Sequence, residues 1–294
     1  MGNMKEDVES LIGAAALPDG VGRREFMKTA LGTGFAAAVM PVCAQTVVKT
    51  SDAGLTAGEV MLDIGGQQVP VYHAQPEGGK NLPVVLVVSE IFGVHEHIAD
   101  VARRFAKEGY LALAPDLFIR QGDPKKYTTN AELIKEVVSK VPDAQVMTDL
   151  DACVAWAGRH GGDASRLGIT GFCWGGRITW LYAAHNPKVK AGVAWYGRLV
   201  GDKSELAPRH PVDVAADLKA PVLGLYGAKD AGIPLASVEK MKTALAEAGA
   251  KSAFVVYPDS GHAFHADYRP SYVEADARDG WKRCLEWFRR HGVA

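Results

Sequence analysis

Short apolar runs alternate with helical segments along most of this 294-residue chain, and this alternation strongly limits the folds open to it. Leu82–Glu90 (LPVVLVVSE) is apolar almost throughout, as expected for a strand buried on both faces of a sheet. His97–Tyr110 follows with apolar residues at helical spacing and a glycine near its end. Further strands are expected at Leu111–Phe118, Ser165–Phe172, Val189–Gly197, Ala220–Gly227 and Lys251–Pro258. This order predicts an α/β fold with a mostly parallel central sheet and helices on both faces.

The connections between these strands predict the remaining elements. Met61–Glu77 reads as two short antiparallel strands hinged at Gly65-Gly66. Further helices are expected at residues 131–140, 144–160, 177–185, 237–248 and 277–291. In such a sheet, ligands bind beyond the carboxyl ends of the strands, so residues that follow strands are the first candidates for a site.

Composition excludes some partners. The 33 lysines and arginines nearly balance 34 aspartates and glutamates, for a net charge of −1. No basic field or block of Lys and Arg is present, so no nucleic-acid partner is expected. The 48% hydrophobic and 23% charged residues are ordinary for a soluble globular protein.

The N-terminus has the features of an export signal. Arg23 and Arg24 precede an uncharged run, Thr29–Val48, that is rich in Ala, Gly and Thr. Val42 and Ala44 place small side chains before a cleavage point after Ala44. This arrangement resembles a twin-arginine signal peptide, with which bacteria export folded proteins.

Two units are therefore expected: residues 1–44 as an N-terminal extension with the signal, and residues 45–294 as a single domain. The precursor would engage the twin-arginine export machinery, and the mature protein would be periplasmic or secreted. The alternatives are a membrane anchor, for which the run is only weakly apolar, and a lipid anchor at Cys43, which Met-Pro-Val before it fits poorly. No stable membrane span is expected in the mature form.

Cysteine usage gives neither an even disulfide framework nor a metal-binding spacing. After loss of the signal, Cys153, Cys173 and Cys284 remain. Cys153 and Cys284 lie in amphipathic helical patterns that favour core packing. An oxidising compartment could join these two, and the sequence leaves that pairing open.

Cys173 occupies the centre of a turn with the spacing of a nucleophile elbow. Gly171-Phe172-Cys173-Trp174-Gly175 follows a predicted strand and precedes a predicted helix. Glycines two residues to either side allow close approach of strand and helix, and the helix N-terminus favours a thiolate. The N–H of Trp174 is placed to donate to an oxyanion. The alternative is a buried cysteine in a glycine-rich turn.

An acid and a base follow in the order that α/β-hydrolases use. Asp230 lies in the loop after one late strand, and His262 lies in a Gly-His pair after the last strand. His262 is the candidate general base, Asp230 would hold its tautomer, and His265 is the fallback base. His95 and His97 lack the H-E-x-x-H spacing, so no metal site is expected.

Glu90 ends an otherwise apolar strand. A carboxylate buried there without a partner would cost several kcal/mol, so Glu90 is expected to face the mouth of the site. The next residue, Ile91, would supply the second oxyanion donor through its backbone N–H.

With these residues in view, the sequence resembles the dienelactone hydrolase (carboxymethylenebutenolidase) family over Met61 to Gly292. The motifs that carry the resemblance are S-E-I-F-G at Ser89–Gly93, A-P-D-L-F at Ala114–Phe118, G-F-C-W-G-G at Gly171–Gly176, Y-G-A-K-D at Tyr226–Asp230 and G-H-A-F at Gly261–Phe264.

The resemblance implies one α/β-hydrolase domain without a cofactor, which cleaves a small lactone or ester through Cys173, Asp230 and His262. In this family the glutamate corresponding to Glu90 hydrogen-bonds the resting thiol and takes part in forming the thiolate when substrate arrives. A thiol kept neutral in this way is less exposed to oxidation.

The chain departs from the family where substrate carboxylates are bound. Family members that act on dienelactone usually carry an arginine four residues after the catalytic histidine, where this chain has Ala266. Arg269 and Arg120 are the candidate replacements, and Lys125 and Lys126 are alternative cations. An ammonium group cannot reproduce the bidentate fork of a guanidinium.

A second interpretation is that the chain has the hydrolase fold but no catalytic activity. Because fold does not fix function, the chain could instead be a non-catalytic module that binds a ligand or partner. A thiol oxidoreductase is disfavoured, because no resolving cysteine lies near Cys173 in the sequence.

Overall fold

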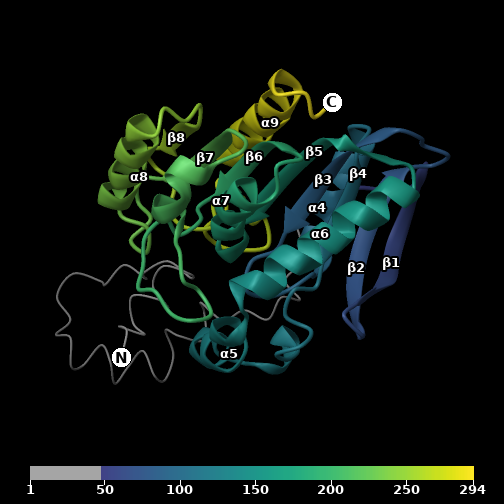
Figure 1. Cartoon of the computed structure of the whole chain (residues 1–294), viewed down its shortest axis with the longest axis horizontal. Helices are drawn as coiled ribbons and strands as arrows, with labels where there is room; N and C mark the ends of the chain where they lie inside the picture. The colour runs from purple at the N-terminus through teal and green to yellow at the C-terminus, as the bar shows by residue number, and fades with distance from the viewer. Residues whose placement is uncertain (1–47) are drawn as a thin grey trace.

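The computed structural model describes residues 48–294, so the predicted signal, its cleavage point and Cys43 lie outside the described residues. The described part forms an eight-stranded sheet in the order β1-β2-β4-β3-β5-β6-β7-β8 (Figure 1). Its strands are β1 (Leu55–Ile64), β2 (Gln67–Pro76), β3 (Leu82–Val88), β4 (Leu111–Pro115), β5 (Gly162–Phe172), β6 (Val189–Trp195), β7 (Val222–Gly227) and β8 (Ala253–Tyr257). The β1–β2 and β2–β4 pairs are antiparallel, and every later pair is parallel. The predicted α/β-hydrolase architecture is confirmed.

Helices cover both faces of the sheet (Figure 1). They are α4 (Glu96–Lys107), α5 (Asn130–Glu136), α6 (Asp143–Arg159), α7 (Trp174–His185), α8 (Leu235–Glu247) and α9 (Glu274–Arg290), with short 3₁₀ turns η2 (Pro124–Lys126), η3 (Val138–Lys140) and η4 (Pro211–Asp217). On one face Phe105 of α4 packs against Trp281 of α9, with ring centroids 4.5 Å apart. On the other face Tyr182 of α7 donates a hydrogen bond of 2.8 Å to Asp151 of α6.

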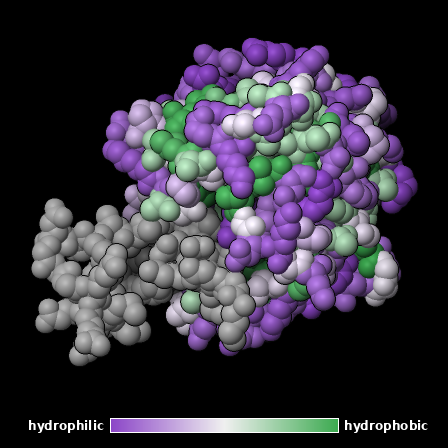
Figure 2. Space-filling model, turned by 60° about the vertical axis from the view of Figure 1, so that its left-hand side comes forward, coloured by the Kyte–Doolittle hydropathy of each residue, from purple (hydrophilic) through white to green (hydrophobic). Residues whose placement is uncertain are grey.

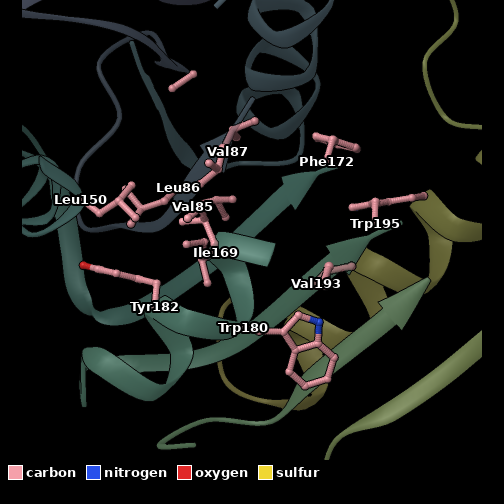
Figure 3. Close-up of a cluster of buried hydrophobic side chains, with 14 of the residues drawn as sticks. Val85, Leu86, Val87, Leu150, Ile169, Phe172, Trp180, Tyr182, Val193 and Trp195 are labelled. Atoms are coloured by element: carbon pink, nitrogen blue, oxygen red, sulfur yellow. The ribbon is translucent and has the colours of Figure 1, made fainter. Parts of the chain in front are cut away.

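A large part of the core lies where β3, β5 and β6 meet α6 and α7 (Figure 3). Six of the seven residues of β3 are buried, which confirms a strand covered on both faces. Trp180 and Trp195 are among the largest fully buried side chains. Each buried aliphatic side chain in such a core contributes about 1.5–3 kcal/mol, so the central strands are held firmly. A firm sheet gives the loops at its carboxyl edge a fixed platform.

The placement of the cysteines settles the disulfide question. Cys153 on α6 and Cys284 on α9 are both buried and free. Their helices cover opposite faces of the sheet, so the pairing that the sequence left open is wrong for this fold. Burial raises the pKa of both thiols above the ordinary range, as expected for inert packing residues.

Hydrogen bonds connect the start of the described chain to helix α4 and to a loop. The N–H of Val48 donates to Asp267 Oδ2 at 2.8 Å, and the N–H of Thr50 donates to Asp100 Oδ1 at 2.5 Å. Arg103 Nε donates to the carbonyl of Thr50 at 3.0 Å. These contacts join a segment near residue 50 to the loop that follows β8.

The outer surface is mainly hydrophilic in the face that Figure 2 shows, with smaller apolar areas between the polar side chains. Among residues 48–294, no helix combines the length and the apolar character needed to cross a bilayer.

Candidate active site

Cys173 sits in the sharp turn between β5 and α7, in a backbone conformation unusual for a residue with a side chain. Its φ is 55° and its ψ is −114°. A Cβ on Gly171 would lie 2.1 Å from the carbonyl oxygen of Gly175, and a Cβ on Gly175 would lie 2.3 Å from that of Val88. The two glycines are therefore required for the close approach of strand and helix, as the sequence predicted. Strain of this kind persists only where the surroundings fix it, and it is common at functional sites.

The predicted acid and base form a buried pair. His262 Nδ1–H donates to Asp230 Oδ2 at 2.7 Å, and both side chains are buried. The other oxygen, Asp230 Oδ1, accepts from the N–H groups of Gly232 and Ile233 at 3.0 and 3.1 Å. The carboxylate is thus held on both sides, which fixes the orientation and tautomer of the imidazole.

His262 is also coupled to Cys173. Burial by itself would lower the pKa of His262, but the charges of Asp230 and Cys173 and the hydrogen bonds to both raise it to about 10. With Nδ1 on Asp230, Nε2 is the nitrogen left for the sulfur. The ring of Tyr196 supports the imidazole edge-on, with centroids 5.2 Å apart. The structure therefore brings the three residues predicted for the triad together.

Glu90 lies beside the elbow and is buried, with 1% of its surface exposed, rather than open at the mouth of the site. Its partner is Tyr268, whose hydroxyl donates a hydrogen bond to Glu90 Oε2. No sequence pattern singled out Tyr268, which lies in an irregular loop six residues after His262. Its only sequence signal was an aromatic residue with a hydroxyl next to the candidate Arg269.

The two candidate arginines have different surroundings. Arg269 is half-buried beside the site: its guanidinium carbon lies 5.2 Å from the ring centroid of Phe92, and Glu90, Tyr268 and Cys173 act on it electrostatically. Arg120 instead binds Asp149 of α6 through its two terminal guanidinium nitrogens, Nη1 and Nη2, at 2.6 and 2.9 Å.

The ion pair with Asp149 accounts for Arg120 structurally, and the guanidinium fork is no longer open for a substrate carboxylate. The lysine alternatives, Lys125 and Lys126, are exposed on η2.

The oxyanion donors lie where the sequence places them, after β3 and at the start of α7. Within residues 48–294, neither the N–H of Ile91 nor that of Trp174 has another hydrogen-bond partner. The role of both N–H groups as oxyanion donors stays a prediction.

The fallback base is not placed for catalysis. His265 is fully buried and stacks on Phe172, with ring centroids 5.0 Å apart, and it packs on Trp195 at 4.5 Å. Burial, together with the charges of His97 and Arg104, lowers its pKa well below the ordinary value. His265 is therefore a neutral packing residue.

A second histidine–aspartate pair, also missed in the sequence, lies behind the site. His97 Nδ1 and Asp267 Oδ1 are 2.7 Å apart, and both side chains are buried. Burial would raise the pKa of Asp267, but the hydrogen bond and charge of His97, with help from Val48 and Arg104, lower it. Among the described residues, no cluster of three or more His, Cys, Asp or Glu side chains suits a metal ion.

Comparison with known proteins assigns the chain to a family. The model of the dienelactone hydrolase family matches residues 69–292. The chain belongs to the dienelactone hydrolase family. As a member, it is a hydrolase of carboxylic esters or lactones, with the α/β-hydrolase fold.

Individual relatives support the same assignment for this hydrolase. It is 64% identical over 273 residues to a Methylorubrum extorquens protein provisionally named carboxymethylenebutenolidase, covering 92% of this chain and 94% of that one. An Escherichia coli protein of the same provisional name is 57% identical over 267 residues, covering 90% of this chain and 98% of that one. A Klebsiella pneumoniae crystal structure, provisionally named a dienelactone hydrolase, is 62% identical with a TM-score of 0.79, covering 80% of this chain and 99% of that one.

Proposed function

We propose that this hydrolase cleaves a small lactone or ester through a covalent acyl-enzyme, with Cys173 as the nucleophile. The observation that carries the proposal is the position of Cys173: a strained turn at a helix N-terminus, coupled to an imidazole that Asp230 orients. A helix N-terminus and an imidazole that can accept the proton both favour the thiolate, which is the nucleophilic form of the thiol.

The steps balance with these residues alone. The thiol proton passes to His262 as the sulfur of Cys173 attacks the carbonyl carbon, and the carbonyl oxygen becomes an oxyanion. The carbon–oxygen bond then breaks, and the leaving oxygen takes the proton from His262; in a lactone it stays attached to the acyl chain. Water next attacks the thioester, gives a proton to His262 and releases the acid, and the sulfur recovers its proton.

Three further residues complete the proposal. The N–H groups of Ile91 and Trp174 stabilise the oxyanion, which in a water-poor site is worth about 2.7–4 kcal/mol per donor. Glu90 accepts the hydrogen bond of the resting thiol and takes part in forming the thiolate when substrate binds, as the family resemblance implies.

Arg269 supports an anionic substrate. It places a cation beside Cys173, and Phe92 and Tyr268 flank it with apolar ring surface. A small lactone that carries a carboxylate would fit this combination. The name carboxymethylenebutenolidase, which the relatives carry, describes a lactone of that chemistry.

The test is a panel of aryl esters and of lactones with and without a carboxylate, assayed with wild type and Cys173→Ala. We expect the variant to lose about 10⁴–10⁶ in kcat, since the members of a triad act as a unit. Mass spectrometry of wild type quenched during turnover should find the acyl group on the peptide that contains Cys173.

Cys153→Ala is the matched control, because it removes a buried thiol of the same kind from α6. It should keep the activity of wild type. Cys173→Ala protein with activity within tenfold of wild type, or an acyl group found on another residue, would overturn the nucleophile assignment.

A further inference from the structure

The hydrogen bond between Tyr268 and Glu90 joins two loops that are 178 residues apart in the chain. Glu90 follows β3, and Tyr268 lies between His262 and α9. Glu90 Oε2 accepts from the phenol, whereas Glu90 Oε1 is buried and has no hydrogen-bond partner among residues 48–294. A buried carboxylate oxygen without a hydrogen-bond donor lowers the stability of the fold. A hydrogen-bond donor that approaches Oε1 would therefore be bound favourably.

The phenol itself is held by its neighbours. The ring of Tyr268 lies edge-on to that of His95, with centroids 4.8 Å apart and an interplanar angle of 75°. Burial and the charge of Glu90 raise the pKa of Tyr268 well above its ordinary value, so the hydroxyl keeps its proton and stays a donor. Tyr268 therefore offers Glu90 a fixed, neutral hydrogen-bond donor.

Glu90 and Cys173 share the same electrostatic surroundings. Both act on Tyr268, Arg269 and Tyr196. The first turn of α7 also touches the strand that leads to Glu90, since a Cβ on Gly175 would lie 2.6 Å from the carbonyl oxygen of Ser89. An ionised Glu90 in this place opposes a second negative charge on the sulfur.

We propose that Tyr268 is a positioning residue of this hydrolase: its hydroxyl holds the carboxylate of Glu90 in place, and Glu90 in turn keeps the resting thiol of Cys173 unreactive. The inference rests on the proposed function of Cys173. Without the hydroxyl, the carboxylate of Glu90 is free to turn toward Arg269. The negative charge then moves away from the sulfur, and the thiolate forms more readily.

The test measures alkylation of the resting protein by iodoacetamide, with each cysteine followed by mass spectrometry. We expect Tyr268→Phe to raise the alkylation rate of Cys173 at neutral pH by about tenfold, which corresponds to about 1.4 kcal/mol in favour of the thiolate. Glu90→Gln should raise it similarly. The double variant Glu90→Gln/Tyr268→Phe should react no faster than Glu90→Gln, because Tyr268 acts through Glu90.

Two controls separate positioning from loss of structure. Tyr182→Phe removes the same hydroxyl from a bond of the same kind, to Asp151 at 2.8 Å between α6 and α7, and should leave Cys173 unchanged. Cys153 and Cys284 report on folding within every sample, since a loosened protein would expose them too.

An unchanged Cys173 rate in Tyr268→Phe, additive effects in the double variant, or equal acceleration at all three cysteines would overturn the proposal. The readout needs no turnover. If Cys173→Ala shows that another residue is the nucleophile, the proposed function fails while the alkylation cycle still reports on Tyr268.

Discussion

Two buried histidine–aspartate pairs lie in the described part of the chain, and they differ in what the imidazole faces. In both pairs, His262–Asp230 and His97–Asp267, the distance from the histidine Nδ1 to a carboxylate oxygen is 2.7 Å. The first imidazole is coupled to Cys173, which helps to raise its pKa to about 10.

The second imidazole, that of His97, is instead packed against aromatic rings. His97 lies against Tyr268, His265 and Phe172, with centroids 5.3, 5.6 and 6.3 Å away. The comparison teaches that a buried imidazole–carboxylate pair does not by itself indicate a general base. What distinguishes the pairs is the group next to the imidazole, which is Cys173 for His262. The His97–Asp267 pair instead holds the loop between β8 and α9 in place.

The largest effect should separate the two histidines by activity. His262→Gln removes the proposed proton carrier and should lower kcat by about 10⁵, whereas His97→Gln leaves the proposed triad intact and should cost less than tenfold. Steady-state kinetics on the best substrate of the panel measures both. A loss of 10³ or more in folded His97→Gln protein would show that the second pair takes part in the reaction.

The next effect should separate the two aspartates by stability. Asp267→Asn takes a charge from a buried pair and weakens the contacts of His97, Arg104 and the N–H of Val48. We expect a loss of about 3 kcal/mol in the free energy of unfolding, as for one removed partner of a buried ion pair. Urea denaturation measures it. Stability equal to wild type would contradict the holding role, and Asp230→Asn, which should mainly lose activity, is the matched comparison.

The last effect concerns the pH dependence of the free energy of unfolding. The two pairs act at opposite ends of the pH range. The pKa of His262 is about 10 in the folded protein against an ordinary 6.5, so its stabilisation is complete below pH 6.5 and is lost as the pH rises toward 10. The pKa of Asp267 is lowered from 3.8, so its stabilisation is present above that pH and is lost in acid.

Urea denaturation across a pH series reads both ends of this curve. His262→Gln should flatten the alkaline decline alone, and Asp267→Asn should flatten the acid decline alone. If either variant flattened the opposite end, the assignment of the two titrations would be wrong.

The elbow could be predicted from sequence because its determinants are local. A strand, two glycines around Cys173 and a helix follow one another directly within residues 162–185, and this spacing predicts the tight turn. The order of Asp230 and His262 after parallel strands was equally informative, because parallel strands bring their carboxyl ends to one edge of the sheet.

The parts that sequence could not give depend on contacts between distant segments. Tyr268 and Asp267 lie in a loop without periodicity, and their partners Glu90 and His97 lie some 170 residues earlier, so no pattern joins them. For the same reason Arg120 looked open to substrate, although it is paired with Asp149.

The hydrogen bonds of Val48 and Thr50 have a practical consequence for work on this enzyme. They tie the first described residues to the loop between β8 and α9, since Asp267 is the residue just before Tyr268. A recombinant version trimmed back to Ser51 would strip the donor of Val48 from Asp267 and the donors of Thr50 from Asp100. Purification handles and deletion endpoints are therefore best placed well upstream of residue 48, where they leave this anchorage intact.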